Sequence, residues 1–372
     1  MEQEIEAPSF IIKKMLRNFM AGETGNISRM ANKVADEIFK KFKWSFLSLE
    51  DENFQCCKPK SHSPSKESHT HPVDVVLYYL DPYTNRRVFF NTDLKSYSKN
   101  SIKQSSIRSA LKSLAQTIDC ARLSSEWRNR YSYMQDDSPE VRGMLFVYNH
   151  DGEYHKNFYN YIKPADNDEE KSRSINLDGL AIQNKQALYI VEPKLISYLT
   201  TIVNDMSVLH HQGNFPAEKY SFFYPDLRLH KTHGEAMSRP ATIEMLTGPY
   251  LIIKHQEVQK LNETSGDIEI CHPGGYVIYY NRPGSDYHEF MYFFDMLSNF
   301  QILDSGKDIR VRVACADKSP ELIPNFQKAI SSYCTAWGFD DYKKETLESI
   351  KLELIEIVSR SFSTVDIGWS KP

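Results

Sequence analysis

The feature that most constrains this chain is a pair of apolar runs around a short polar turn. Residues 71–97 read HPVDVVLYYLDPYTNRRVFFNTDLKSY. Turn-forming residues separate the runs, and β-branched and aromatic residues fill them, which is the pattern of a β-hairpin. Asp74 lies at the outer end of the first run and Asp93 at the outer end of the second. The pattern raises the question of whether these two carboxylates meet.

The turn sets the register of the hairpin. If Pro82 and Asn85 are the first and last residues of a four-residue loop, the numbers of cross-strand partners add up to 167, as 82 and 85 do. Asp74 then faces Asp93. Because side chains alternate along a strand, Asp93 and Lys95 point to one face of the hairpin, and Asp74 points to that face too.

Like charges directly opposite each other destabilise a sheet. A divalent cation reverses this effect, because carboxylate oxygens are preferred ligands of such ions. A metal held by Asp74 and Asp93, with the ammonium of Lys95 beside it, suits hydrolysis of a phosphodiester. Lys95 would orient the attacking water or neutralise developing charge. The alternative interpretation is that both aspartates end their strands in solvent.

Periodic segments flank the hairpin. Apolar residues at helical spacing predict a helix over residues 26–44, and a short strand follows at 45–49. A second helix with basic residues is predicted over 102–127, before a buried strand at 141–148 and another at 187–191. The order is therefore helix, strand, hairpin, helix, strand, with one further strand at the end.

This order, together with Pro72-Val-Asp74 and Asp93-Leu-Lys95, resembles the PD-(D/E)xK nuclease superfamily, which has a restriction-endonuclease-like core. The two aspartates are 19 residues apart, and the resemblance covers about residues 10–205. It implies a mixed sheet flanked by helices, and cleavage of DNA, or less often RNA, that depends on Mg²⁺ or Mn²⁺.

The resemblance also implies roles for individual residues. Asp74 and Asp93 are the expected metal ligands, the Leu94 carbonyl is a possible further ligand, and Lys95 is the expected water-positioning cation. Members often add a glutamate from the first helix, for which Glu37 is the candidate. Some branches add a glutamine from the helix after the motif. Gln116 is the better match for it and Gln104 the weaker, and the alternative for either is an ordinary surface residue of that helix.

A second motif competes with the first. Asp178 and Glu192-Pro-Lys194 also have a spacing compatible with the superfamily. However, Pro193 removes a hydrogen-bond donor from the sheet at the critical place. We therefore favour the hairpin motif and assign 187–191 to a later strand of the same domain.

The rest of the chain predicts a second domain of α/β or α+β class. A boundary within residues 209–217 divides the chain into a nuclease-like domain, 1–209, and a C-terminal domain, 210–372, for regulation, assembly or substrate binding. The expected elements of the second domain are strands at 250–255, 276–280 and 309–315, and helices at 288–300, 320–337 and 342–362.

Charge is unevenly distributed. Residues 1–135 hold 21 Lys and Arg against 15 Asp and Glu, a net of +6, and the remainder holds 24 against 34, a net of −10. A basic N-terminal part fits a polyanionic partner such as nucleic acid, DNA being favoured. The alternative is a solvated surface on which the charges segregate without consequence.

Several function classes lack support. Apolar runs are too short for a membrane span, the N-terminus lacks a secretory pattern, and the sequence contains neither a phosphate-binding loop nor a GxSxG elbow. Six cysteines without framework spacing favour the reducing cytoplasm. Cys56-Cys57 with His62, His69 and His71 invite a zinc-site interpretation but match no familiar zinc finger. We favour the alternative that the histidines lie in a flexible polar loop over residues 58–71, beside buried cysteines.

The sequence therefore predicts a cytoplasmic, metal-dependent nuclease, most simply a DNA endonuclease serving as the effector of a bacterial antiphage (antiviral defence) or restriction system. A homo-oligomer or a partner protein is expected to form through the C-terminal domain. The alternative function is a non-catalytic nucleic-acid-binding or assembly subunit that retains the nuclease fold.

Overall fold

The computed structural model describes most of the chain between residues 33 and 358. The described ranges are 33–47, 52–65, 68–131, 140–158, 162, 175, 177–184, 186–225, 236–261, 266–303, 306–338 and 341–358. The beginning of the first predicted helix, residues 26–32, lies outside them. Among the helices that can be described, none has the length and apolar character that a bilayer span requires.

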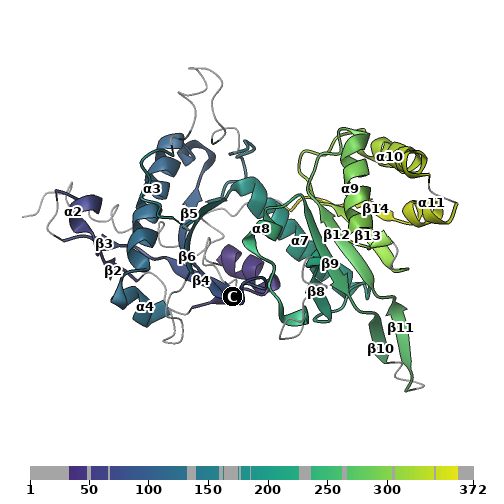
Figure 1. Cartoon of the computed structure of the whole chain (residues 1–372), viewed down its shortest axis with the longest axis horizontal. Helices are drawn as coiled ribbons and strands as arrows, with labels where there is room; N and C mark the ends of the chain where they lie inside the picture. Colours follow the sequence, from purple (N-terminus) through teal and green to yellow (C-terminus); the bar gives the residue numbers. More distant parts are fainter. Residues whose placement is uncertain are drawn as a thin grey trace, which may run out of the picture.

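The first half of the chain forms a five-stranded mixed sheet in the order β1-β4-β5-β6-β7 (Figure 1). The β1–β4 and β4–β5 pairs are antiparallel, whereas β5–β6 and β6–β7 are parallel. The strands are β1 (Ser45–Phe46), β4 (Val75–Leu80), β5 (Arg87–Tyr97), β6 (Glu140–Asn149) and β7 (Leu188–Val191). This mixed sheet is the restriction-endonuclease-like core that the sequence predicted.

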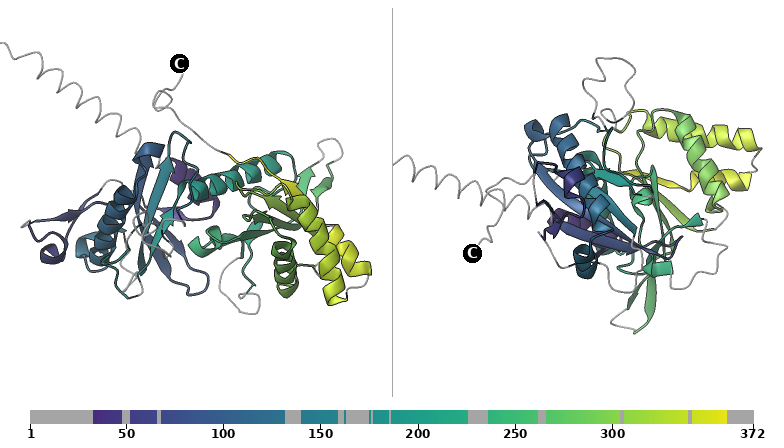
Figure 2. Two further views of the ribbon diagram at one scale, coloured as in Figure 1. Left: turned by 90° about the horizontal axis from the view of Figure 1, so that it is seen from above. Right: turned by 60° about the vertical axis from the view of Figure 1, so that its left-hand side comes forward.

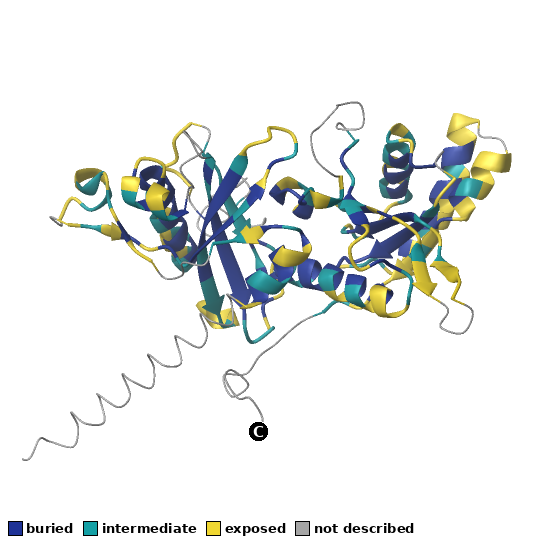
Figure 3. Ribbon diagram, turned by 90° about the horizontal axis from the view of Figure 1, so that it is seen from below, coloured by how far each residue is buried: buried dark blue, intermediate teal, exposed yellow. Residues whose placement is uncertain are grey.

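Helices cover both faces of this sheet. The helix at residues 33–41 and α7 (Pro193–His211) share one hydrophobic core with one face, and α3 (Gln104–Ala121) and α4 (Ser125–Tyr131) share another core with the opposite face. Strand β4 is consequently buried on both faces over nearly its whole length (Figure 3). Such burial explains why VVLYYL is a continuous apolar run instead of an alternating one.

The hairpin register is the predicted one. Strands β4 and β5 pair from Val75 opposite Thr92 to Leu80 opposite Arg87, so partner numbers add up to 167 as expected. The turn is fixed by Asp81, whose Oδ1 accepts hydrogen bonds from the backbone N–H of Tyr83 at 2.8 Å and of Thr84 at 2.9 Å. This short-range bonding is the usual reason for Asp at the start of a turn.

A small extension projects from the edge of the first half beside α3 and α4 (Figure 1). It contains β2 (Phe54–Gln55), α2 (Pro59–His62) and β3 (Thr70–His71), with β2 and β3 paired antiparallel. The prediction of a flexible loop that carries His62, His69 and His71 is therefore wrong in part. Pairing with β2, which lies outside the predicted loop, makes β3 a strand.

The second half of the chain forms another five-stranded sheet, in the order β8-β9-β12-β13-β14. Its strands are β8 (Tyr220–Phe222), β9 (Tyr250–His255), β12 (Gly275–Tyr280), β13 (Asp308–Val313) and β14 (Lys351–Leu354); the helices α8 (Ile243–Leu246), α9 (Tyr287–Asn299), α10 (Leu322–Trp337) and α11 (Asp341–Glu348) accompany them. Strands β10 (Val258–Leu261) and β11 (Ile268–His272) form a separate exposed hairpin (Figures 1 and 3).

The predicted helix over residues 342–362 is correct up to Glu348 and wrong at Lys351–Leu354, and its last residues, 359–362, lie outside the described ones. Helix α11 ends at Glu348, and Lys351–Leu354 form β14, which pairs in parallel with the edge of β13. Leu347 and Ile350 are buried and three residues apart, which explains why this part of the segment has the apolar pattern of a helix. After Ile350 the chain pairs with the open edge of β13 and satisfies the backbone hydrogen-bonding groups there. The spacing of apolar residues within the segment carries no information about that distant edge.

The two sheets have the same strand order and the same strand directions. Strands β8–β9 and β9–β12 are antiparallel, and β12–β13 and β13–β14 are parallel, as in the first sheet. In each half a helix precedes the first strand, and helix α3 or α9 follows the central one. The sequence shows no internal repeat, so this likeness exists only at the level of topology.

Helix α7 connects the halves and is anchored to the second sheet by a buried ion pair. Arg312 of β13 donates through Nε to Asp205 Oδ2 at 2.9 Å, and Tyr279 Oη donates to the same oxygen at 3.0 Å. Side chains of both halves meet in one core around this helix. Helix α7 runs across the predicted boundary between residues 209 and 210, which stays a prediction.

Loss of the buried pair should destabilise the fold. Asp205→Ala leaves Arg312, whose side chain is only 10% exposed, without its buried partner, so we expect a loss of about 3 kcal/mol. Urea unfolding measures it. The matched control is Asp36→Ala, which removes the exposed Asp36–Lys40 pair of the first helix and should cost less than about 0.5 kcal/mol. Equal losses would contradict the anchoring role of Asp205.

Candidate active site

Asp74 and Asp93 meet at the end of the hairpin opposite to its turn. Asp74 directly precedes β4, one step beyond the Val75–Thr92 pair, and Asp93 is the next residue of β5 after Thr92. The two carboxyl groups are electrostatic neighbours. Asp74 Oδ2 also accepts a hydrogen bond from the backbone N–H of Leu94 at 2.7 Å. The observed register thus puts Asp74 and Asp93 at the same end of the hairpin, and their role as a metal-binding pair stays a prediction.

Lys95 joins this pair on the same face of β5. Its Nζ donates to Asp93 Oδ1, and Asp74 is a further electrostatic neighbour. Burial lowers the pKa of Lys95, but the Asp93 and Asp74 carboxylates outweigh burial and hold it above its usual value. The ammonium therefore stays protonated at neutral pH and carries positive charge beside the two carboxylates.

The environment of Asp74 disfavours its charge in the absence of a cation. Burial raises the pKa of Asp74 first, the Asp93 carboxylate raises it further, and the Leu94 N–H and Lys95 lower it, which leaves the pKa at about 6. Folding therefore favours the protonated form of Asp74. This contribution to stability is full below pH about 4 and is lost as the pH rises through about 6. Two close carboxylates with a raised pKa are typical of metal and catalytic sites.

The rigidity of this corner comes from the sheet. Strand β5 is central, paired with β4 on one side and β6 on the other, and Leu94 is buried between Asp93 and Lys95. Leu94 thus points into the core, whereas its two neighbours point the other way. The backbone pairing of Asp93 and Lys95 with β6, opposite Leu145 and Val147, holds both side chains in place.

The remaining predicted residues have different positions. Glu37 is half-buried in the helix at residues 33–41, and its role as a third ligand stays a prediction. Gln116 Nε2 donates to the His62 carbonyl at 3.2 Å, so this side chain contacts the extension. The Leu94 N–H is engaged by Asp74, and metal binding by the Leu94 carbonyl stays a prediction. The structure therefore brings together Asp74, Asp93 and Lys95 most clearly.

One neighbour of the site was not among the sequence candidates. Tyr97 ends β5, two residues after Lys95, and interacts electrostatically with Lys95 and Asp93. Burial raises its pKa, and Asp93 adds to that effect while Lys95 opposes it. The alternation of Asp93, Lys95 and Tyr97 along one strand is a period-two signal that could have identified it.

Glu192-Pro-Lys194 of the competing motif does not lie on a β-hairpin. Glu192 lies just before α7, where its Oε2 accepts a hydrogen bond from the backbone N–H of Phe158 at 2.6 Å. Pro193 is the first residue of α7, and Lys194 Nζ pairs with Asp317 of the second half at 2.8 Å. Lys194 therefore supports the junction between the halves, whereas Glu192 holds the backbone of Phe158 within the first half.

The comparison with known families agrees with the geometry. Residues 20–195 match the model of the GAPS4 protein PD-(D/E)XK nuclease domain. This part of the chain, which contains the first sheet and the Asp74–Asp93–Lys95 site, belongs to the PD-(D/E)xK nuclease superfamily, a group of hydrolases that act on phosphodiester bonds. The resemblance inferred from the hairpin is thereby confirmed. No curated protein matches the chain.

The coupling of the two carboxyl groups can be measured directly. In metal-free protein, carbon-13 NMR of the aspartate carboxyl groups should show Asp74 titrating near pH 6. Asp93→Asn removes the neighbouring charge but leaves the burial, so the midpoint should fall toward the ordinary value near about 3.9 without reaching it. Asp36→Asn, on the first helix, is the control. An Asp74 midpoint that stays unchanged in Asp93→Asn would contradict the proximity.

Proposed function

We propose that the chain is a metal-dependent nuclease, most simply a DNA endonuclease, with Asp74, Asp93 and Lys95 at its centre. The observation that carries the proposal is the arrangement at one end of the hairpin, where Lys95 donates to Asp93 and the backbone N–H of the intervening Leu94 donates to Asp74. The raised pKa of Asp74 means that its ionised form destabilises the folded protein at neutral pH. A protein that binds no metal there would gain nothing in return. A cation between the carboxylates removes that cost.

The donor set fits a hard divalent cation. Asp74 and Asp93 would hold Mg²⁺ or Mn²⁺ through carboxylate oxygens, the ligands that such ions prefer. The Leu94 carbonyl and Glu37 are the further candidates that the superfamily pattern suggests. When bound, the ion polarises a phosphate oxygen and lowers the pKa of a coordinated water.

The side chains of this chain supply the remaining requirements. The charge of Lys95 attracts the phosphodiester and stabilises negative charge that develops during cleavage. Its bond to Asp93 fixes the direction of the ammonium group, so little reorganisation is needed at the moment of reaction. Asp74 is held by the Leu94 N–H and is ionised above pH about 6, which allows it to act as a ligand at neutral pH.

We propose that the second half binds a substrate or a partner and does not cleave phosphodiester bonds. Its sheet has the topology of the first, but one step beyond the Tyr250–Tyr280 pair it carries Pro249 and Asn281 where the first sheet has Asp74 and Asp93. Pro283 stands at the position that corresponds to Lys95. This half therefore lacks the carboxylate pair and suits substrate binding, a partner protein or a homo-oligomer.

The matched nuclease family and the charge distribution support the biological setting that we propose. A basic first part favours a polyanion, for which we propose DNA. We propose a role as effector in a bacterial antiphage defence system, acting in the cytoplasm. Six cysteines without the spacing of a disulfide framework fit this compartment.

Cleavage should depend on the three residues. Purified full-length protein is incubated with supercoiled plasmid, single-stranded DNA and RNA, with Mg²⁺ or Mn²⁺ present. We expect Asp74→Asn, Asp93→Asn and Lys95→Gln each to lower the cleavage rate by at least about 100-fold, because each removes charge needed in the transition state. Initial rates from gel densitometry measure the effect, and the comparison of substrates distinguishes DNA from RNA.

Two variants are matched controls for this assay. Asp81→Asn removes a carboxylate from the turn end of the same hairpin, and the amide keeps an acceptor for the turn. Lys99→Gln removes an exposed lysine just after β5. Both should retain cleavage close to that of the wild type. Equal cleavage by all variants would reject the site, and binding of DNA without cleavage under any condition would favour the alternative of a binding or assembly subunit.

Metal binding should be visible without catalysis. Because a cation offsets the repulsion of the carboxylates, Mg²⁺ should raise the melting temperature of the wild type at about pH 8. At about pH 5 the rise should be smaller, since Asp74 is then largely protonated. Differential scanning fluorimetry measures both shifts. An undiminished shift in Asp93→Asn would place the Mg²⁺ site elsewhere.

A further inference from the structure

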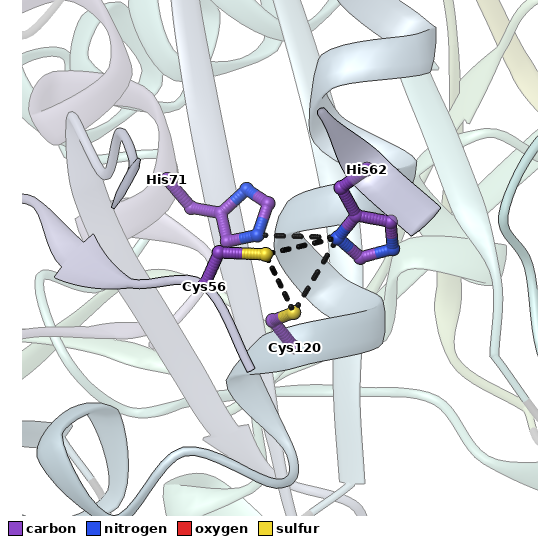
Figure 4. Close-up of side chains that lie close together, drawn as sticks. All are labelled: Cys56, His62, His71 and Cys120. Atoms are coloured by element: carbon purple, nitrogen blue, oxygen red, sulfur yellow. Dashed lines mark hydrogen bonds between the residues drawn. The ribbon is translucent and has the colours of Figure 1, made fainter. Parts of the chain in front are cut away.

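Four metal-ligating side chains converge where the extension meets helix α3 (Figure 4). Cys56 follows β2, His62 ends α2, His71 ends β3, and Cys120 belongs to the last turn of α3. The first three lie within 16 residues of one another, whereas Cys120 comes from a helix beyond the hairpin. Their ligand atoms all lie within 4.8 Å of one another.

Four of the six separations among these atoms match the edges of a tetrahedral site, and all six are below 4.8 Å. Cys56 Sγ and Cys120 Sγ are 3.7 Å apart, and they lie 3.4 and 3.5 Å from His62 Nδ1. His62 Nδ1 and His71 Nε2 are 3.4 Å apart. Zinc bonds of about 2.3 Å to sulfur and about 2.0 Å to nitrogen give tetrahedral edges of roughly 3.8 Å between sulfurs, 3.5 Å between sulfur and nitrogen, and 3.3 Å between nitrogens.

Hydrogen bonds alone do not account for the cluster. His62 Nδ1 faces three polar atoms at once: the sulfur of Cys56, the sulfur of Cys120 and Nε2 of His71. A neutral imidazole nitrogen has either one N–H or one lone pair, so it satisfies one of the three at most. The site is also shielded from water, since His71 is 1% exposed and the His62 side chain 3% exposed. A cation at the centre gives each of the four atoms a partner.

The surroundings support metal ligands. His62 Nε2 lies 3.1 Å from Asp119 Oδ2, the outer carboxylate that commonly orients a metal-bound histidine. Lys58 Nζ in turn holds both oxygens of Asp119, at 2.7 and 2.8 Å. The backbone N–H of Cys57 donates to Cys120 Sγ at 3.3 Å, and that of Lys58 donates to Cys56 Sγ at 3.3 Å. Such donors stabilise negative charge on sulfur.

We propose that Cys56, His62, His71 and Cys120 form a closed, tetrahedral zinc site. Two sulfur and two nitrogen ligands select zinc over the hard cation proposed for Asp74 and Asp93. Four protein ligands leave no open position, so the role is structural. The ion ties the extension to α3 and fixes His71, which lies three residues before Asp74. The site stands apart from the proposed nuclease function and does not rest on it.

Metal content of the full-length protein tests the site. Protein is purified under reducing conditions, with any affinity tag removed, and zinc is measured by inductively coupled plasma mass spectrometry. The wild type should hold about one zinc per chain. Cys56→Ser, His71→Ala and Cys120→Ser should lose most of it. The matched control is Cys57→Ser, which alters the exposed neighbouring cysteine and should keep the zinc.

Cobalt substitution separates this site from the carboxylate site and from misfolding. Co²⁺ added to zinc-stripped wild type should give the intense d–d absorption of a tetrahedral ion and a sulfur-to-cobalt charge-transfer band. Asp93→Asn should keep both signals, and Cys120→Ser should lose the charge-transfer intensity of one thiolate. The proposal is overturned if the folded wild type holds no zinc and gives no such spectrum, if Cys57→Ser loses as much zinc as Cys56→Ser, or if an intact mass two daltons lower reveals a Cys56–Cys120 disulfide.

Discussion

The register of the β4–β5 hairpin is the constraint on which the site depends. The turn at Asp81 makes Val75 face Thr92, and one step further the same pairing makes Asp74 meet Asp93. A shift by one residue would turn one of the carboxylates to the other face of the sheet. Both faces of β4 are buried against different helices, so such a shift would also place every side chain of the strand in the wrong core. Packing of the whole first half thus protects the geometry of one pair of residues.

The same argument explains why this part of the site could be predicted from the sequence. Turn chemistry at Asp81 and strand alternation are local, and together they determine that Asp74, Asp93 and Lys95 share a face. Contacts between distant segments are not determined in this way. Cys120 is 49 residues beyond His71, and only the packing of α3 against the sheet brings the two together. Likewise β14 forms because the edge of β13 is open, a fact that its own sequence does not contain.

The two sheets have the same topology but differ in the residues at the open end of their central antiparallel strand pair. The first has a charged corner at the open end of its hairpin, whereas the second has Pro249 and Asn281 there and joins them by a backbone hydrogen bond of 2.9 Å. The second half therefore has the strand topology of the first without the repulsion between two neighbouring carboxylates. Its β10–β11 hairpin is exposed along most of both strands.

The two metal centres that we propose differ in what they require of the fold. Asp74 and Asp93 are held in place by the sheet, so an ion there relieves repulsion in a corner that is already formed. The extension has only a two-residue strand pair and a single turn of helix, and such short elements have little stability of their own. A zinc ion would supply the missing stability by linking three points of the extension to α3. Because His71 is followed at once by Pro72, Val73 and Asp74, the ordering of the extension also restrains the backbone that carries the first carboxylate.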